Sequence, residues 1–172
     1  MRIPMRKQPT VSQNQAPKKQ RGFSLIELLI VVAVILIIAA IAIPNFIRSR
    51  MRANESAAVQ NLRIVNTANV VYLTTYGIGY SDGLPKLSGN QVIVDQNDAG
   101  LIDTVLASGL KNGYTYTYAI LSRDAQNHVV GYSFTAAPTT VGATGDRYFY
   151  TDQTAIIRQN TTGAAGPTDP SI

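Results

Sequence analysis

Glu27 is the residue whose chemistry fits its surroundings least. It lies inside the apolar segment 23–43, and all sixteen residues that follow it in this segment are apolar. A charged side chain deep in a bilayer costs about 2.5 kcal/mol or more, and such residues are usually functional. A carboxylate near the interface can instead snorkel to water, which would leave it no special role. A functional Glu27 needs a positive partner, because pairing at low dielectric constant offsets the desolvation of both charges.

No other residues have the spacing of a catalytic or metal centre. The chain has no cysteine and one histidine, which excludes disulfides, thiolate ligands and multi-histidine metal sites within one chain. Ser133 lacks the glycine that would complete a nucleophile elbow. Asp95, Asp98 and Asp103 have a chemistry that suits calcium, but no known calcium-loop spacing is present, so loop and capping roles are favoured. We therefore expect no enzyme activity, catalytic residue, metal or cofactor.

The apolar segment is long enough to cross a bilayer. Its twenty-one residues would form a helix about 31 Å long, which matches the thickness of the hydrocarbon core. The segment is apolar on every face, unlike the amphipathic helix of a soluble domain. A cleaved secretory signal peptide fits poorly, because the run is long and the sequence at 41–44 is a poor cleavage site.

An amphipathic continuation of this helix is predicted up to Tyr76. Apolar residues recur there at helical spacing among arginine, asparagine and glutamine; they are Ile47, Met51, Ala58, Leu62, Val65 and Tyr72. Pro44 removes one hydrogen bond of the helix, so we expect a continuous helix that is kinked near Pro44. Gly77 and Gly79 are expected to end it.

The last part of the chain changes to the period of a β-strand. Tyr114, Tyr116 and Tyr118 alternate with smaller residues and share one strand face, which we expect to pack against the long helix. Further strands are predicted at 129–135, 147–151 and 155–158, the last two joined by a short hairpin link at residues 152–153.

Outside these strands, one short helix and a loose end are predicted. The helix is expected at 101–107, with Asp98 as its N-cap and Gly109 just past its end. The segment from Gln159 onward has no pattern and is expected to be loose. The predicted fold class is therefore α+β.

The positive charge of the chain belongs to its start. Residues 1–22 hold six basic residues and no acid, whereas the other 150 residues hold nine basic and ten acidic ones. A basic face for nucleic acid is therefore not expected. The early cations favour a cytoplasmic N-terminus. The arginines at 48, 50 and 52 are expected on a solvated helix face with an Arg52–Glu55 pair, and acidic groups or lipid headgroups are their alternative partners.

Residues 18–32 read KKQRGFSLIELLIVV, and residues 40–46 read AIAIPNF. This stretch resembles the N-terminal signature of type IV pilins and of the pseudopilins of type II secretion. The resemblance is close over residues 18–65 and extends to the architecture beyond. It implies the pilin fold, in which a long N-terminal helix, a hydrophobic spine kinked near Pro44, packs against a small antiparallel β-sheet head.

The resemblance also divides the chain and assigns roles to residues. It implies a cleaved basic leader (1–22), a transmembrane and filament-core helix (23–44), an amphipathic continuation (45–76) and a β-rich head with a loose tail (77–172). Cleavage would follow Gly22, and Phe23 would become the N-methylated first residue. Glu27 would pair with the amino group of Phe23 in a neighbouring subunit, and a pair within one chain is the alternative.

The implied function is that of a structural subunit of a type IV pilus-like filament. The precursor would lie in the bacterial inner membrane with its head in the periplasm, and would later enter a filament. The implied partners are further copies of the chain, a prepilin peptidase and methyltransferase, the inner-membrane assembly machinery, and membrane lipid before assembly. A type II secretion pseudopilin is the alternative, and a membrane-anchored periplasmic binding domain that never polymerises is the third interpretation.

Three features depart from the pattern of many relatives. No glycine lies between Phe23 and Pro44, so local melting of the helix is less expected. The leader is long, and a start at Met5 would shorten it to 18 residues. Without cysteine, no disulfide can close a C-terminal loop, and packing, sheet hydrogen bonds or neighbouring subunits must hold the head together.

Overall fold

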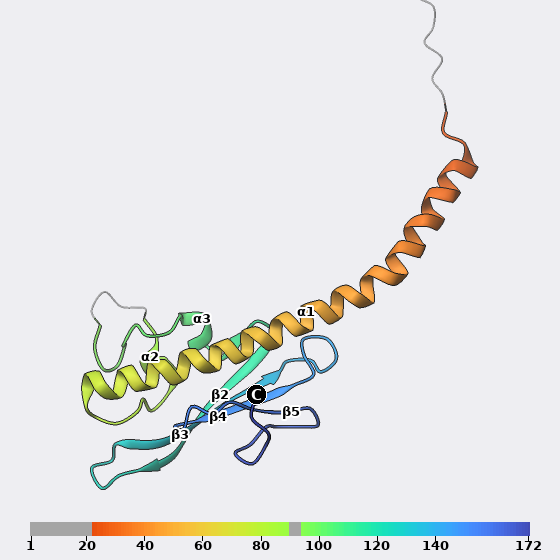
Figure 1. Cartoon of the computed structure of the whole chain (residues 1–172). Helices are drawn as coiled ribbons and strands as arrows, with labels where there is room; N and C mark the ends of the chain where they lie inside the picture. The colour runs from red at the N-terminus through yellow and green to blue at the C-terminus, as the bar shows by residue number, and fades with distance from the viewer. Residues whose placement is uncertain (1–21, 90–93) are drawn as a thin grey trace, which may run out of the picture. The chain divides into compact units, whose positions relative to one another are not determined.

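A computed structural model describes residues 22–89 and 94–172 of the chain (Figure 1). The chain divides into two compact units, one that ends at Ala40 and one that runs from Ile41 to Ile172. Its elements, in chain order, are α1 (Leu25–Tyr76), α2 (Leu84–Leu87), α3 (Thr104–Ala107), β1 (Leu110–Lys111), β2 (Tyr114–Arg123), β3 (Val129–Pro138), β4 (Tyr148–Asp152) and β5 (Arg158–Asn160). The predicted α+β class is confirmed.

Helix α1 is continuous over 52 residues, and Pro44 lies inside it. The predicted single helix is therefore confirmed, and the kink near Pro44 stays a prediction. The helix ends at Tyr76, as predicted from the glycines that follow it. Gly77 adopts a φ of +68° and donates its N–H to the Leu73 carbonyl at 3.0 Å. This left-handed conformation is easy only for glycine, which is why the residue stops the helix.

From Met51 onward one face of α1 is buried. Five of the six predicted apolar positions are buried, namely Met51, Ala58, Leu62, Val65 and Tyr72. Ile47 is an error of the prediction, because its side chain is 42% exposed and lies one turn before the buried face begins. The same face also buries polar residues that the periodicity did not mark, namely Glu55, Asn61, Asn66 and Asn69.

The five strands form one antiparallel sheet in the order β1-β2-β3-β4-β5, and each strand pairs with the next in sequence. The second half of α1 packs against this sheet, as the core shared by Leu62, Val65, Phe134 and Phe149 demonstrates (Figure 1). The antiparallel head packed against a long helix is therefore confirmed.

The predicted tyrosine face of β2 is confirmed as a packing face. Tyr116 is buried, and its hydroxyl accepts a hydrogen bond from Asn61 Nδ2 of α1 at 2.8 Å. The Tyr118 hydroxyl lies 3.1 Å from Asn69 Oδ1 of the same helix. Polar side chains of α1 thus bind the inner face of the sheet at two successive tyrosines.

The last strand begins later than predicted. Strand β4 matches the expectation to within a residue, but β5 covers Arg158–Asn160 instead of 155–158. The Asp152 carboxylate accepts a hydrogen bond from the Thr154 N–H at 2.9 Å, and Ala155 adopts a φ of +61°. This turn chemistry widens the link beyond the two residues that were predicted.

The short helix before β1 is capped by a different aspartate from the one predicted. Helix α3 begins at Thr104, and the Asp103 carboxylate accepts a hydrogen bond from the Leu106 N–H at 2.9 Å. Asp98 instead closes a tight turn with Asp95, whose carboxylate accepts its N–H at 3.0 Å. The prediction of Asp98 as the N-cap was wrong because the helix starts later than its apolar residues suggested.

The tail from Gln159 is not loose, in contrast to the prediction. The Gln159 N–H donates to the Pro170 carbonyl at 3.0 Å, and the Ile172 N–H donates to the Ile157 carbonyl at 3.1 Å. Arg158 donates from Nη1 to the Asp169 carbonyl at 2.8 Å. The chain end therefore folds back along β5 and covers that edge of the sheet.

Candidate functional site

Gly22 and Phe23 lie in exposed backbone just before helix α1. The Phe23 side chain is 80% exposed. A Cβ atom added to Gly22 would meet no described atom within 4 Å, so the fold of the described chain gives no reason for glycine at this position. An exposed junction with one small residue is open to close approach by another protein.

Glu27 lies in the first turn of α1 and makes a hydrogen bond that the sequence analysis missed. Its Oε2 accepts the backbone N–H of Ser24 at 2.9 Å, just before the helix begins. The spacing Ser-x-x-Glu is that of a capping box, and this signal was readable in the sequence. A carboxylate here also complements the positive end of the helix dipole. Glu27 therefore has a structural role within one chain, and its side chain is exposed to further partners.

The residues after Glu27 form the one described helix segment that is long and apolar enough to cross a membrane. Its most apolar window of 18 residues has a mean hydropathy of 3.3, and none of that window is buried in the chain. Exposed apolar surface of this extent marks a site for lipid or for another protein. The first half of α1 is therefore incomplete as a single chain in water.

Glu55 does not pair with Arg52, in contrast to the prediction. Its Oε2 binds Nε and Nη2 of Arg147, each at 2.8 Å, and its Oε1 accepts the Asp146 N–H at 3.0 Å. Glu55 is buried, so the partners of both oxygens compensate the desolvation of the charge. Arg147 continues the network to Gln159 with a hydrogen bond of 2.8 Å. Sequence spacing missed this network because its partners are more than ninety residues apart.

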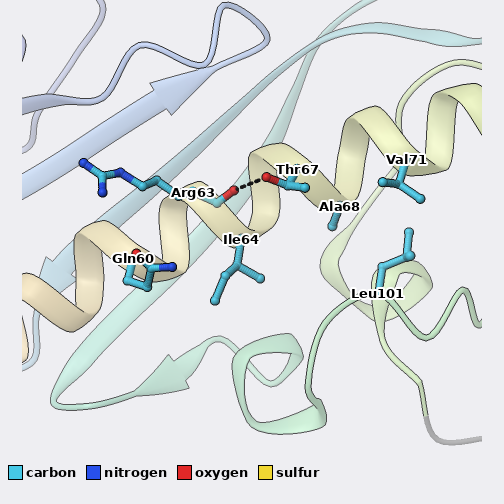
Figure 2. Close-up of a pocket in the computed structure, with 7 residues that line it drawn as sticks. All are labelled: Gln60, Arg63, Ile64, Thr67, Ala68, Val71 and Leu101. Atoms are coloured by element: carbon cyan, nitrogen blue, oxygen red, sulfur yellow. Dashed lines mark hydrogen bonds between the residues drawn. The ribbon is translucent and has the colours of Figure 1, made fainter.

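An apolar groove of about 310 Å³ lies on the second half of α1. Figure 2 shows Ile64, Ala68 and Val71 of the helix facing Leu101, which precedes α3. Thr67 donates its hydroxyl proton to the Arg63 carbonyl at 3.0 Å and so satisfies its own polar group. Apolar side chains from α1 and from the segment before α3 thus share this groove, which suits contact with another apolar surface.

The weaker candidates of the sequence analysis have ordinary places in the fold. Ser133 lies within strand β3 and is buried, which is not the sharp strand-to-helix turn of a nucleophile. Asp103 caps α3 and pairs with Lys111 Nζ at 2.7 Å, and this hydrogen bond lowers the pKa of the Asp103 carboxyl. No group of three or more histidine, cysteine or acidic residues that could hold a metal occurs in the described ranges 22–89 and 94–172.

Comparison with known proteins gives the class that this helix and head define. A family model described as "Prokaryotic N-terminal methylation motif" matches residues 17–43. Over 139 residues the chain is 30% identical to the type IV wide pilus major component PilA4 of Thermus thermophilus, a match that covers 81% of this chain and 92% of the other. The chain belongs to the type IV pilin family, whose members are structural subunits and not enzymes.

Two further matches cover shorter stretches of the chain. The chain is 58% identical over 50 residues to the type IV major pilin protein PilA of Myxococcus xanthus, which covers 29% of this chain and 23% of that protein. It is 31% identical over 58 residues to the type II secretion system core protein G of Escherichia coli, which covers 34% and 40%. No solved structure matches the chain.

Proposed function

We propose that this chain is a prepilin that is cut between Gly22 and Phe23, N-methylated at Phe23, and polymerised with further copies through the first half of α1. The observation that carries the proposal is the apolar helix segment in which the chain buries no residue, with a carboxylate in its first turn. Such a helix is stable in lipid before assembly and against other apolar helices after it.

Glu27 provides the charge that guides assembly in this proposal. Cleavage after Gly22 creates an amino group four residues before Glu27, and methylation leaves that amine cationic. The Ser24 N–H occupies one side of the carboxylate at 2.9 Å, and the other lone pairs can accept a second charged donor. We propose that this donor is the Phe23 amine of a neighbouring subunit. A pair within one chain is the alternative.

The proposal also covers the location of each part of the chain and the proteins that process and assemble it. The basic leader (1–22) would stay in the cytoplasm, a prepilin peptidase and methyltransferase would process it, and inner-membrane machinery would assemble the subunit. The head would lie in the periplasm before assembly, and the chain itself would catalyse nothing.

We also propose a kink near Pro44, where the missing N–H weakens the helix. A Pro44→Ala chain should then give a longer distance between spin labels on either side.

The decisive experiment is to measure the intact mass and the N-terminus in sheared extracellular filaments and in membranes. A chain that starts at methylated Phe23 in the sheared filaments is the expected result. An uncut chain that is found in membranes and is absent from sheared filaments would overturn the proposal and leave a simple membrane anchor that never polymerises.

The same measurement separates a pilus from a secretion pseudopilus. The pseudopilus is favoured by the match to a type II secretion protein, but that match covers only 58 residues. The match to a pilus component extends over 139 residues and reaches the head, so we propose the pilus. Processed chains confined to the cell envelope would instead support the pseudopilus.

Substitution of Glu27 tests the pairing step separately from cleavage. Glu27→Gln keeps an oxygen that can accept the Ser24 N–H, so it keeps the cap and removes only the charge. We expect cleavage to remain and filament yield to fall at least tenfold, as in Glu27→Ala. Normal filaments from Glu27→Gln together with few from Glu27→Ala would mean that Glu27 acts as a helix cap alone.

A further inference from the structure

Arg48, Arg50 and Arg52 form an exposed cluster directly after the apolar part of α1. Among the described residues, none of their guanidinium groups has a hydrogen bond or an ion pair, whereas Arg147 binds Glu55 at 2.8 Å. Three unpaired cations within five residues repel one another unless an anion binds them. The fold of the chain gives no reason for this cluster.

The position of the cluster points to the membrane surface. The unbroken apolar run ends at Ile43, and after Asn45 two more apolar residues, Phe46 and Ile47, precede Arg48. A membrane-spanning helix takes about 17–25 residues. Counted from Phe23, Arg48 is therefore the first residue beyond the longest common span. Side chains on a helix lean toward its N-terminus, so the arginines lean back toward the apolar segment. Long basic side chains in such places reach the headgroup layer.

The spacing of the cluster favours lipid over a protein partner. At about 100° per residue, Arg48 and Arg52 share one side of α1 and Arg50 lies on the opposite side. A protein docked on one side would contact only part of the cluster, whereas headgroups reach every exposed side of a helix.

The acids near the cluster already have partners. Arg48 and Arg52 line a pocket with Glu55 and Asp146. Glu55 is used by Arg147 and by the Asp146 N–H, and Asp146 accepts the Gly142 N–H at 3.1 Å. The positive groups therefore remain in excess on this part of α1.

We propose that Arg48, Arg50 and Arg52 bind the phosphates of anionic phospholipids in the leaflet nearest the head, as long as the subunit is in the membrane. Guanidinium groups bind phosphate with paired hydrogen bonds. The contact fixes the depth of the helix and must be broken when the subunit is extracted. This inference rests on the proposed membrane-inserted precursor.

The absence of cysteine in the chain makes a clean test available. Ser49→Cys places a single fluorescent donor within the cluster of the full chain. The chain is reconstituted into phosphatidylcholine vesicles with a trace of acceptor-labelled phosphatidylglycerol or phosphatidylcholine, each labelled on its acyl chain so that the headgroup stays native. We expect an enrichment of phosphatidylglycerol around the donor of about fivefold, reduced by added salt.

The variant R48Q/R50Q/R52Q should lose most of this enrichment, and the lysine triple variant should keep part of it. Arg63→Gln is the matched control, because Arg63 is an exposed arginine farther along the same helix, and it should leave the enrichment unchanged. The near-ultraviolet circular dichroism of the tyrosines checks that each head is folded.

Each result decides the question. If energy transfer shows the same enrichment of phosphatidylglycerol around the wild-type chain and the glutamine variant, the lipid inference is overturned. The proposed insertion into the membrane would be unaffected by that result. No energy transfer to either lipid means that the chain does not insert, and the proposed precursor fails with it. A glutamine variant that keeps its lipid preference but forms no filaments would assign the cluster to contacts between copies and overturn the inference.

Discussion

The two halves of helix α1 have the same backbone conformation but different surroundings. The most apolar window of the first half has no buried residue within the chain, whereas the second half buries Leu62 and Val65 completely against the head. The second half is thus stabilised by its own sheet, and the first is left for lipid or other copies. One element can therefore serve both anchoring and folding, because its two sequences suit two different solvents.

The two glutamates of α1 repeat this difference. Glu55 is buried, and Arg147 and the Asp146 N–H satisfy both of its oxygens. Glu27 is exposed and accepts one backbone N–H from Ser24. The charge of Glu55 is compensated inside one molecule, whereas Glu27 keeps capacity for a partner outside it. The predictions that follow test this division between the two halves.

High pH should unfold the head and spare the first half of α1. Burial raises the pKa of Tyr114, Tyr116, Tyr118 and Tyr132 above the ordinary value of 10.0. Above about pH 10 the unfolded state loses these protons and the folded state keeps them, so stability falls as pH rises. Each such tyrosine contributes about 1.4 kcal/mol per pH unit.

This loss is measured by denaturant unfolding of the full chain in detergent at pH 9, 10 and 11, with the tyrosine circular dichroism as the signal. Helical signal from the apolar half should persist after the tyrosine signal has disappeared. Stability that is flat from pH 9 to 11 would contradict the buried tyrosine face.

Truncation of a core residue should separate the two halves next. Leu62 is completely buried, and Leu62→Ala should lower the free energy of unfolding of the head by about 3 kcal/mol. Leu36→Ala is the matched control, because the Leu36 side chain is 64% exposed in the apolar half. It should leave the unfolding midpoint of the head in detergent within error, and an equal loss from both substitutions would remove the distinction.

Loss of the buried carboxylate should have a smaller effect. Glu55→Ala leaves Arg147 and the Asp146 N–H without their acceptor, and we expect a loss of about 2 kcal/mol because Arg147 is partly exposed to water. Arg52→Gln removes a charge one turn away that has no described partner, and it should change stability by less than about 0.5 kcal/mol. A larger effect of Arg52→Gln would restore the Arg52–Glu55 pair that the sequence suggested.

Local signals predicted much of this architecture. The unbroken apolar run, the spacing of Leu62 and Val65, and the alternation of Tyr114 and Tyr116 each report a period set by one element. Gly77 ended the helix as predicted, because a left-handed cap has a strong preference for glycine. The Ser24–Glu27 cap was equally local, but the pairing hypothesis for Glu27 drew attention away from its spacing.

Other features could not be predicted because their causes are distant in sequence. The Glu55–Arg147 pair joins residues 92 positions apart, and the spacing of charges along one helix favoured Arg52 instead. The tail looked loose by composition, yet Ile172 returns to Ile157 through the backbone. Backbone pairing of this kind depends on where the sheet places an edge and not on which side chains the tail carries.

The smallest predicted effect concerns the polar contacts between the second half of α1 and the sheet. Tyr116→Phe leaves the buried Asn61 Nδ2 without its acceptor at 2.8 Å, and we expect a loss of about 1 kcal/mol. Tyr76→Phe is the matched control, since the Tyr76 hydroxyl has no described partner. In a double-mutant cycle with Asn61→Ala, the coupling energy should be about 1 kcal/mol. No measurable coupling would mean that apolar packing alone holds this half of the helix to the head, in which case the buried asparagines would be tolerated rather than stabilising.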